Sequence, residues 1–344
     1  MTAPCPRDEA ELDARLAEPG DAAVAALSRC PGDLVVLGAG GKMGPTLARM
    51  ARAAAQHADG ARPRRVIAVS RFSSPRAERA LRDAGVHTVR CDLLDRAAVA
   101  ALPDAPNVIF MAGQKFGTRD APSRTWMMNI VVPAVCAERY ADARIVAFST
   151  GNVYPLTPAA GGGSRESDAP APVGEYAWSC LGRERVLEHA AAGGARVALM
   201  RLNYAIDLRY GVLTDLARRI WRGEPVALAM GRVNVIWQGD ANRAALELLP
   251  LAAATPFVLN VTGHDALSVR TLAEQLGARL GRQPRFAGAE APDALLSNTD
   301  RMAATLASPA VSVDTMLDWV AEWVREERPL LDKPTHFDVR DGTF

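Results

Sequence analysis

The sequence predicts an α/β fold: a Rossmann-type, doubly wound parallel sheet with a smaller C-terminal substrate lobe. Short apolar segments alternate with helical patterns over about 115 residues, which is typical of a parallel sheet covered by helices on both faces. A glycine-rich turn joins the first of these apolar segments to the first helical pattern. The length of 344 residues fits one large domain with a smaller partner lobe.

The expected elements follow in order along the chain. A helical stretch at 8–29, broken near Pro19-Gly20, comes first. Expected strands at 34–37, 65–69, 87–90, 107–111 and 144–148 alternate with helices at 46–55, 75–84, 97–102 and 124–140. After a loop at 155–174 come a helix at 176–192 and a strand at 197–202. A last helix at 313–324 carries Trp319 and Trp323, which we expect to pack in a core.

Composition excludes several classes of protein. The net charge of +1 gives no electrostatic footprint for nucleic acid or an anionic membrane surface. No apolar run approaches the roughly 18 residues that span a bilayer, and no apolar segment of a secretory signal is present near the start. The five cysteines are scattered without a C-x-x-C pair, which argues against a disulfide framework or a zinc site. We therefore expect a cytoplasmic protein without metal that acts on a small molecule.

The glycine turn predicts a dinucleotide site. Gly38, Gly41 and Gly44 are spaced three apart, and Gly40 is an additional glycine. Glycines at a strand-to-helix turn let backbone N–H groups approach a pyrophosphate at the start of the helix. Met43 stands where G-x-G-x-x-G would have its third glycine, so this is the G-x-x-G-x-x-G variant. The turn also contains Lys42, and we expect the whole stretch to bind the cofactor.

The end of the second strand bears on the choice between NADP and NAD. An acid commonly holds the ribose 2′-hydroxyl of NAD at this place, and here Ser70 and Arg71 stand instead. Arg71 can pair with a 2′-phosphate, so NADP is favoured, with NAD as the alternative. Arg76 and Lys42 are further candidates for the adenosine end, and Asp92-Leu93 is expected to contact the adenine.

From about Asp33 to the last helix, the chain resembles the extended short-chain dehydrogenase/reductase family, which includes nucleotide-sugar epimerases and dehydratases. Besides the glycine turn and Asp92-Leu93, the resemblance rests on several motifs that occur in the same order as in the family. They are Met111-Ala112-Gly113, Asn129, Phe148-Ser149-Thr150-Gly151-Asn152-Val153-Tyr154, Glu175-Tyr176-Ala177-Trp178-Ser179, Ile236-Trp237-Gln238-Gly239-Asp240 and Asn260-Val261-Thr262-Gly263. The resemblance implies that Met111, Ala112, Gly113, Asn129 and Tyr176 border the cofactor.

The resemblance also implies an active-site pair. Tyr176 corresponds to the catalytic tyrosine and Thr150 to its hydroxyl partner. Hydride transfer at a carbon that bears oxygen needs a proton donor or acceptor for that oxygen, and a second hydroxyl orients and polarises it. The family pattern is Tyr-x-x-x-Lys, however, and here the fourth residue after Tyr176 is Cys180. A cysteine cannot supply the positive charge that lowers the pKa of the tyrosine.

Three explanations of Cys180 stay open at this point. In the first explanation, Lys115, just after the motif Met111-Ala112-Gly113 at the end of the fourth strand, supplies the cation from another direction. Alternatively, the charge of the oxidised nicotinamide ring suffices and the enzyme is slower. The third explanation is a dinucleotide-binding protein without turnover, with a sensing or scaffolding role.

Substrate contacts are expected between the two lobes, and the candidates are Gln114, Asn152, Asn203, Tyr204 and Arg209.

We expect an N-terminal helical extension at 1–30, a dinucleotide-binding domain at 31–200, a substrate lobe mainly at 201–330 with some elements returning to the core, and a tail at 331–344. The leading hypothesis is an NAD(P)-dependent oxidoreductase or epimerase that acts on a hydroxyl or carbonyl carbon of a sugar or sugar-like compound. The resemblance further implies a homodimer built from the paired helices at 124–140 and 176–192.

Overall fold

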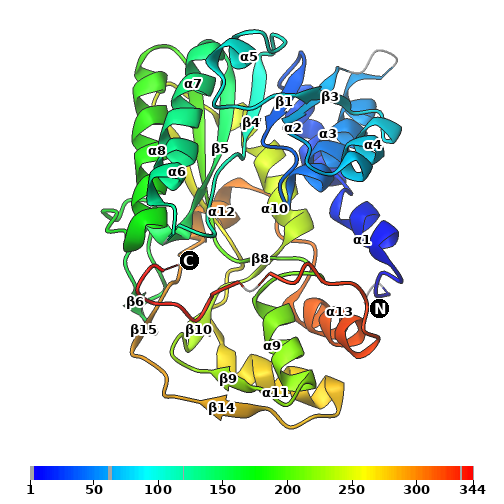
Figure 1. The fold of residues 1–344 in the computed structure, drawn as a ribbon, viewed down its shortest axis with the longest axis vertical. Coiled ribbons are helices and arrows are strands. Elements are labelled where there is room, and N and C mark those ends of the chain that lie inside the picture. Colours follow the sequence, from blue (N-terminus) through cyan, green and yellow to red (C-terminus); the bar gives the residue numbers. More distant parts are fainter. Residues whose placement is uncertain (1–3, 61–63, 119, 334, 344) are drawn as a thin grey trace.

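A seven-stranded parallel sheet forms the centre of the computed structural model, which describes residues 4–60, 64–118, 120–333 and 335–343 (Figure 1). The strand order is β12-β7-β5-β4-β1-β2-β3, and every neighbouring pair is parallel. The seven strands are β1 (Leu34–Leu37), β2 (Val66–Ser70), β3 (His87–Arg90), β4 (Asn107–Phe110), β5 (Arg144–Thr150), β7 (Arg196–Leu202) and β12 (Phe257–Val261). The predicted fold class is confirmed.

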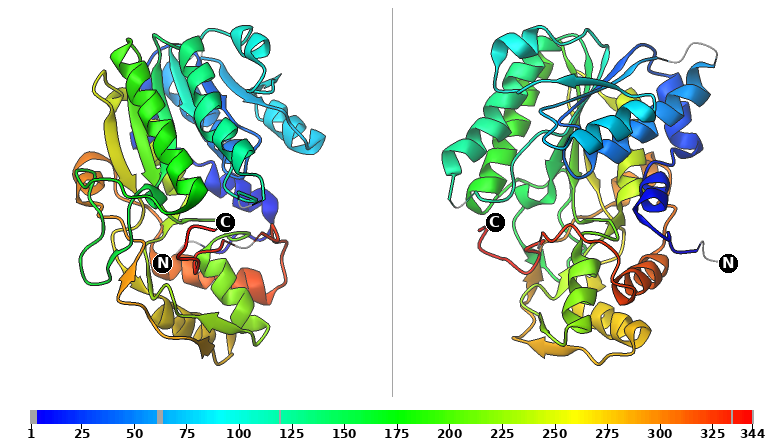
Figure 2. Two further views of the ribbon diagram at one scale, coloured as in Figure 1. Left: turned by 60° about the vertical axis from the view of Figure 1, so that its left-hand side comes forward. Right: turned by 45° about the vertical axis from the view of Figure 1, so that its right-hand side comes forward.

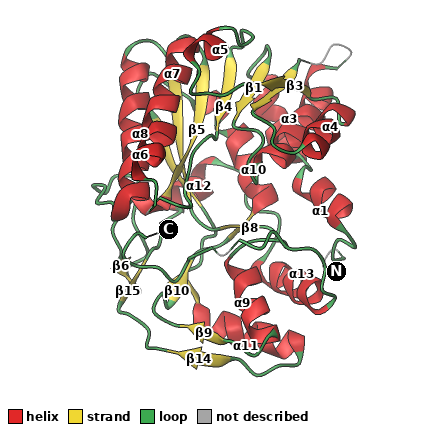
Figure 3. Cartoon of the chain, in the orientation of Figure 1, coloured by secondary structure: helices red, strands yellow, loops and turns green. Residues whose placement is uncertain are grey.

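Apolar residues on alternate faces of the strands explain why helices cover both sides of the sheet (Figures 2 and 3). In β1, Leu34 and Val36 join one core cluster, whereas Val35 and Leu37 join another. Helices α2 (Gly20–Ser28), α3 (Gly44–Asp59) and α10 (Gln238–Glu247) supply the first cluster, and α5 (Arg96–Ala100), α7 (Val132–Arg139) and α8 (Gly174–Ala192) supply the second. α4 (Pro75–Asp83) packs beside β3, and α12 (Asp300–Thr305) packs beside β12.

The smaller lobe lies below the carboxyl edge of the sheet in Figure 1. Its helices are α9 (Val212–Trp221), α11 (Val269–Leu280) and α13 (Val313–Arg325). Its strands are short and paired two by two: β8 (Ala205–Ile206) with β11 (Ile236–Trp237), β9 (Pro225–Ala227) with β14 (Arg285–Ala287), β10 (Arg232–Val233) with β13 (Leu267–Ser268), and β6 (Thr157–Pro158) with β15 (Asp293–Ala294). Trp319 and Trp323 are 2% and 0% exposed in the core of this lobe, as the sequence predicted.

The N-terminal extension serves both halves of the molecule. Leu12 and Leu16 of α1 (Glu9–Leu16) are buried in the core of the lobe. Ala23 and Leu27 of α2 are buried against the sheet instead. The extension therefore packs as an integral part of both cores, because each of its two helices buries its apolar residues against a different half.

One predicted helix is wrong in detail. The stretch expected as one helix at 124–140 is divided into α6 (Pro122–Trp126), a π-helical turn at Met127–Val131, and α7. Pro133 at the start of α7 has no N–H to donate, and its ring would clash with the carbonyl four residues earlier. The wider π turn relieves this conflict and places Asn129 in the interior. Short 3-10 turns also occur at Gly151–Val153 and Leu249–Leu251.

The order of the strands fixes where a ligand enters. From β1 the chain builds outward through β2 and β3 on one side, and from β4 it builds outward on the other side. In open parallel sheets a crevice forms at the carboxyl ends of the strands where this order reverses. Gly38 follows β1 and Met111 follows β4, so the crevice lies between the glycine turn and the strand-four motif. Among the described residues, no helix is long and apolar enough to cross a membrane.

Candidate functional site

A cavity of about 340 Å³ lies where the carboxyl edge of the sheet meets the lobe. Most of the residues singled out in the sequence line it: Gly38, Gly41, Lys42, Met43, Met111, Gly113, Gln114, Lys115, Thr150, Asn152, Tyr176, Asn203 and Tyr204. The lobe adds Tyr210, Gly211 and Val212, and the C-terminal tail adds Thr335. Elements far apart in the sequence thus close one site.

The glycine turn has the shape of a phosphate cradle. Gly38 adopts φ +89°, and a Cβ there would lie 2.6 Å from the backbone N of Ala112. A Cβ on Gly44 would collide with the carbonyl of Ala39, whereas Gly41 has nothing nearer than 3.4 Å and faces the cavity. The following helix α3 begins without any side-chain cap on its first N–H groups. Free N–H groups at a helix start favour an anion, so these residues fit a dinucleotide pyrophosphate.

The predicted adenosine residues lie beside this turn at the end of β2. A Cβ on Gly40 would collide with Oγ of Ser70, so only glycine fits there. Arg71 follows Ser70 and is exposed. Asp92 is exposed at the end of β3, where its Oδ1 accepts a hydrogen bond from the backbone N–H of Leu94 at 3.1 Å, while Leu93 is buried. These four predicted residues do not line the cavity described above.

Tyr176 stands in the first turn of α8 and lines the cavity together with Thr150 from the end of β5. The Tyr176 hydroxyl forms side-chain hydrogen bonds with Thr150 and with Cys180. Thr150 Oγ1 already accepts from the backbone N of Asn152 at 3.2 Å and from Asn152 Nδ2 at 2.9 Å. Tyr176 and Thr150, which the resemblance paired, thus line the same cavity.

Burial dominates the ionisation of Tyr176. It raises the pKa of the phenol far above the ordinary value, and the neighbouring Cys180 raises it further. Arg183 and Thr150 act in the opposite direction. Burial also raises the pKa of the Cys180 thiol, whose side chain is 0% exposed. The residue one helical turn after Tyr176 is therefore a neutral thiol, and Tyr176 is protonated at neutral pH.

Lys115 approaches Tyr176 from the opposite wall of the cavity. Its Nζ lies 5.7 Å from the centroid of the Tyr176 ring and 5.7 Å from that of Phe116. Burial lowers the pKa of Lys115 to about 8, and Cys180 opposes this shift. An ammonium at this distance from an aromatic ring is attracted to it. The structure thus brings a cation to the tyrosine from the loop after β4, as the first of the three explanations requires.

A second cation near the tyrosine was not singled out from the sequence. Arg183 lies on α8 seven residues after Tyr176, lines the cavity, and is 6% exposed. Its Nη1 donates to the carbonyl of Phe148 at 2.6 Å, and its Nη2 donates to Oδ1 of Asn129 at 2.8 Å. A Cβ on Gly113 would lie 2.5 Å from Arg183 Nη2, so that glycine makes room for the guanidinium. The seven-residue spacing, two helical turns, is the signal that could have revealed it.

Asn129 is placed differently from the prediction. It is fully buried and does not line the cavity. Its Oδ1 accepts from the backbone N of Gln114 at 2.9 Å, and its Nδ2 donates to the Gln114 carbonyl at 2.9 Å and to Ser179 Oγ at 2.8 Å. With its amide fully used, Asn129 acts on the site indirectly, by holding the loop that carries Gln114 and Lys115. Ala112 is likewise buried and serves as backbone packing for Gly38.

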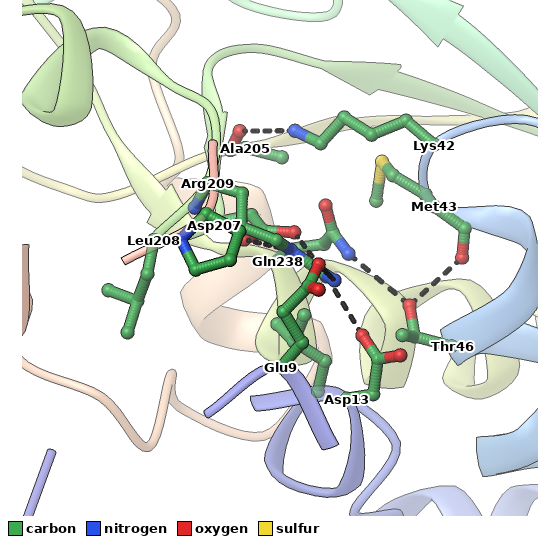
Figure 4. Close-up of polar contacts among 12 residues, drawn as sticks. Glu9, Asp13, Lys42, Met43, Thr46, Ala205, Asp207, Leu208, Arg209 and Gln238 are labelled. Atoms are coloured by element: carbon green, nitrogen blue, oxygen red, sulfur yellow. Dashed lines mark hydrogen bonds and ion pairs between the residues drawn. The ribbon is translucent and has the colours of Figure 1, made fainter. Parts of the chain in front are cut away.

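Arg209 is also placed differently, because it does not line the cavity and contacts acidic side chains instead (Figure 4). Its Nη2 pairs with Asp207 at 2.9 Å and with Asp13 at 2.8 Å, and its Nη1 pairs with Glu9 at 3.4 Å. The arginine therefore ties the lobe to α1 and is not available to a substrate. Figure 4 also shows Lys42 reaching across to the lobe, where its Nζ donates to the Ala205 carbonyl at 3.5 Å.

The remaining substrate candidates face the cavity. Asn203 is 2% exposed, and its Nδ2 donates to the Leu295 carbonyl at 3.4 Å. Tyr204 has a positive φ of 41°, and its hydroxyl donates to the Phe337 carbonyl at 3.5 Å. Gln114 lines the same wall as Lys115. Among the described residues, no group of three or more His, Cys, Asp and Glu side chains is placed to hold a metal ion.

Comparison with known proteins assigns the family. Residues 34–247 match the model of the NAD dependent epimerase/dehydratase family. The chain belongs to this family. The match covers the glycine turn, Thr150, Tyr176 and the start of the lobe, which agrees with the resemblance to extended short-chain dehydrogenases/reductases. A search of curated protein sequences finds no match.

Several solved structures share this fold over most of the chain. MoeE5, solved with UDP-glucose and NAD, has a TM-score of 0.70 and 22% identity over 86% of this chain and 99% of its own. The UDP-Glc/GlcNAc 4-epimerase of Campylobacter jejuni has a TM-score of 0.70 and 19% identity over 86% of this chain and 100% of its own. The UDP-glucose 4-epimerase of Thermotoga maritima, solved with UDP-glucose, has a TM-score of 0.68 and 20% identity over 86% of this chain and 99% of its own.

Proposed function

We propose that this chain is an NAD(P)-dependent oxidoreductase or epimerase that acts on a hydroxyl- or carbonyl-bearing carbon of a sugar or sugar-like small molecule. The observation that carries the proposal is that Tyr176, Thr150 and Lys115 face one cavity that also receives the glycine turn. The sugar-nucleotide epimerases among the structural neighbours support the reaction class.

The cofactor would lie along the carboxyl edge of the sheet. Gly38, Gly41 and the uncapped start of α3 would hold the pyrophosphate, and Met111 and Gly113 would border the nicotinamide end. When bound, the dinucleotide supplies hydride exchange with the substrate carbon. The NAD found in MoeE5 supports a nicotinamide dinucleotide.

Tyr176 is proposed as the group that transfers the proton at the substrate oxygen. In the carbonyl-reducing direction, the protonated phenol donates its proton to the carbonyl oxygen as that oxygen gains charge. In the alcohol-oxidising direction, Tyr176 must first lose its proton, and the raised pKa opposes this. The hydroxyl of Thr150 and the charge of Arg183 both favour the ionised phenol, so they reduce that cost.

Lys115 is proposed as an auxiliary cation that replaces the family's lysine. Its ammonium lies over the face of the Tyr176 ring, and its loop is held by the amide of Asn129. A positive charge near the phenol favours the phenolate and stabilises negative charge on the reacting oxygen. Gln114, Asn152, Asn203 and Tyr204 are proposed to orient the substrate hydroxyls.

NADP is proposed as the preferred cofactor. Arg71, just after β2, is exposed, and Ser70 stands where an acid would repel a 2′-phosphate. A guanidinium binds phosphate oxygens in a bidentate manner.

We also propose that the protein forms a homodimer through α6 and α8. Trp126 and Trp178 are 39% and 51% exposed on these helices, and Met127 between α6 and α7 is 44% exposed. Large exposed apolar side chains on neighbouring helices are typical of an interface.

The experiment that tests the function is cofactor turnover by the purified protein over a panel of aldoses, ketoses and uronates. We expect either net NADPH oxidation with at least one carbonyl compound, or conversion of one sugar to its epimer without net NADPH oxidation. Tyr176→Phe should reduce kcat by roughly 10²- to 10⁴-fold, whereas NADPH binding, followed by fluorescence, should be retained. Undiminished turnover in Tyr176→Phe would remove this residue from the mechanism, and NADPH binding without turnover on any compound would favour a binding protein.

A further inference from the structure

The C-terminal segment crosses the mouth of the cavity. After α13 the chain runs back between the sheet and the lobe toward β6 and β15 (Figure 1, red). Thr335 of this segment lines the main cavity. His336, Val339, Arg340 and Gly342 line an adjoining space, which shares Lys115, Asn152 and Tyr204 with the main cavity. The two spaces therefore lie next to each other and share part of their walls.

The segment is fixed to the lobe at its first half. The backbone N and Oγ1 of Thr335 donate to Oδ2 of Asp215 at 2.8 and 2.6 Å. Phe337 is 3% exposed and belongs to the core of the lobe. Its carbonyl accepts from the Tyr204 hydroxyl at 3.5 Å. This part of the segment is thus held by a buried aromatic ring and by hydrogen bonds.

Its second half is fixed at the other side of the cavity. Arg340 Nη1 donates to the carbonyls of Asp293 at 2.9 Å and Ala229 at 3.1 Å, and its Nη2 forms an ion pair with the Asp293 carboxylate. Gly342 then touches Gly174, the first residue of α8, and a Cβ on either glycine would collide with the other segment's backbone. The segment therefore meets α8 at Gly174, which is two residues before Tyr176.

The space that remains beyond the main cavity is small. The adjoining space measures about 30 Å³, which is room for roughly one or two water molecules. The main cavity of about 340 Å³ must receive the nicotinamide end of the cofactor as well as the substrate. The space beyond Lys115 and Tyr204, which His336, Val339, Arg340 and Gly342 line, is too small for a nucleotide.

We propose that residues 335–342 close the substrate end of the site and restrict it to a small, unconjugated hydroxy or keto compound of about the size of one sugar ring. The inference rests on the proposed function, because it takes Tyr176 as the reacting side chain. It adds the substrate class: the nucleotide-linked sugars named for the solved neighbours do not fit while the segment is in place. His336 adds its ring to the wall of that closed end.

The test measures binding of UDP-glucose to the protein saturated with NADPH, by calorimetry, and needs no turnover. Three forms are compared: the full chain, a chain ending at Asp332, and Arg340→Ala, which releases only the second half and leaves Phe337 in the core. Arg325→Ala, an exposed arginine in the last turn of α13, is the matched control. We expect at least tenfold tighter binding of UDP-glucose in the shortened chain or in Arg340→Ala than in the full chain and the control.

Micromolar binding of UDP-glucose to the full chain, with unchanged hydrogen exchange of residues 335–342, would overturn the proposal. Equal Kd values in all folded forms would overturn it too, since the segment would then set no limit. If the shortened chain fails to fold, Arg340→Ala alone decides. Failure of the full chain to bind either NADPH or NADH would contradict the proposed function instead, so the two failures are distinguishable.

Discussion

The ammonium of Lys115 lies 5.7 Å from the ring centroid of Tyr176, on the wall of the cavity opposite the helix that carries the tyrosine. Within the same helix, the residue one turn after Tyr176 is Cys180, a buried thiol that shares a hydrogen bond with the phenol. The cation near the tyrosine is thus supplied from a different element of the fold. This relationship makes the mechanism testable at single residues.

The first prediction concerns pH. Burial lowers the pKa of Lys115 to about 8, so the side chain is charged below that pH and neutral above it. If the ammonium assists Tyr176, kcat/KM should fall as the pH rises through about 8. Lys115→Met should lower kcat/KM at pH 7 by roughly tenfold to a hundredfold and should abolish this decline. Lys333→Met, an exposed lysine, is the control. If kcat/KM still declines above about pH 8 in Lys115→Met, a group other than Lys115 causes the decline.

The second prediction concerns Cys180. In Cys180→Lys, the new ammonium would lie beside the phenol, lower the pKa of Tyr176 and raise kcat in the alcohol-oxidising direction by about tenfold. Cys180→Ala removes the thiol without adding charge, so its effect on kcat should be small. Both are measured as pH profiles of kcat, with thermal unfolding as the check on folding, since residue 180 is buried. A folded Cys180→Lys protein with unchanged kcat would show that charge at this position does not limit the reaction.

The third prediction concerns the cofactor. Arg71→Ala should weaken NADPH binding by roughly ten- to a hundredfold, because a charge-assisted pair with the 2′-phosphate is lost. The Kd for NADH should change little. Arg79→Ala, at another exposed arginine of α4, provides the comparison. Tighter binding of NADH than of NADPH by the unmodified protein would refute the assignment of NADP.

The fourth prediction concerns stability. Arg209→Ala removes the partner of the fully buried Asp207 and the link between the lobe and α1. Leaving such a carboxylate without its partner should cost about 2 to 4 kcal/mol of unfolding free energy, allowing for the partly exposed Asp13 and Glu9. Denaturant unfolding measures this, and Arg7→Ala, at an exposed surface pair, should barely move the midpoint. If Arg209→Ala weakens NADPH binding as strongly as it lowers stability, Arg209 would have to be counted among the residues of the site.

The fifth prediction concerns assembly. Trp178→Glu places a charge on the exposed face of α8 and should convert the proposed dimer to a monomer, as measured by light scattering after gel filtration. Leu94→Glu, at an exposed leucine after β3, should leave the mass unchanged. A monomeric unmodified protein would end the dimer proposal.

The sequence alone determined the sheet and the cradle at its edge. The strands β1 to β5 and β7 lie within two residues of the expected positions, because short apolar runs between helical patterns encode them locally. The glycine turn was predicted for the same reason, since Gly44 lies against the backbone of Ala39 within the turn, whereas the close contact of Gly38 with Ala112 joins two segments far apart in the sequence. The roles of Tyr176 and Thr150 came from motifs, and these roles remain predictions that the geometry supports.

Only the tertiary structure decided which side chains share the site. Arg209 was expected to meet a substrate and instead meets Asp13, 196 residues earlier. The side-chain amide of Asn129 is hydrogen-bonded to the loop that carries Gln114. Thr335 lines the cavity although it lies near the end of the chain. Such contacts join segments that no local pattern relates, because burial and charge pairing depend on how distant elements pack. The sequence alone places Cys180 one helical turn after Tyr176, whereas only the packing of distant segments brings the cation of Lys115 to the tyrosine ring.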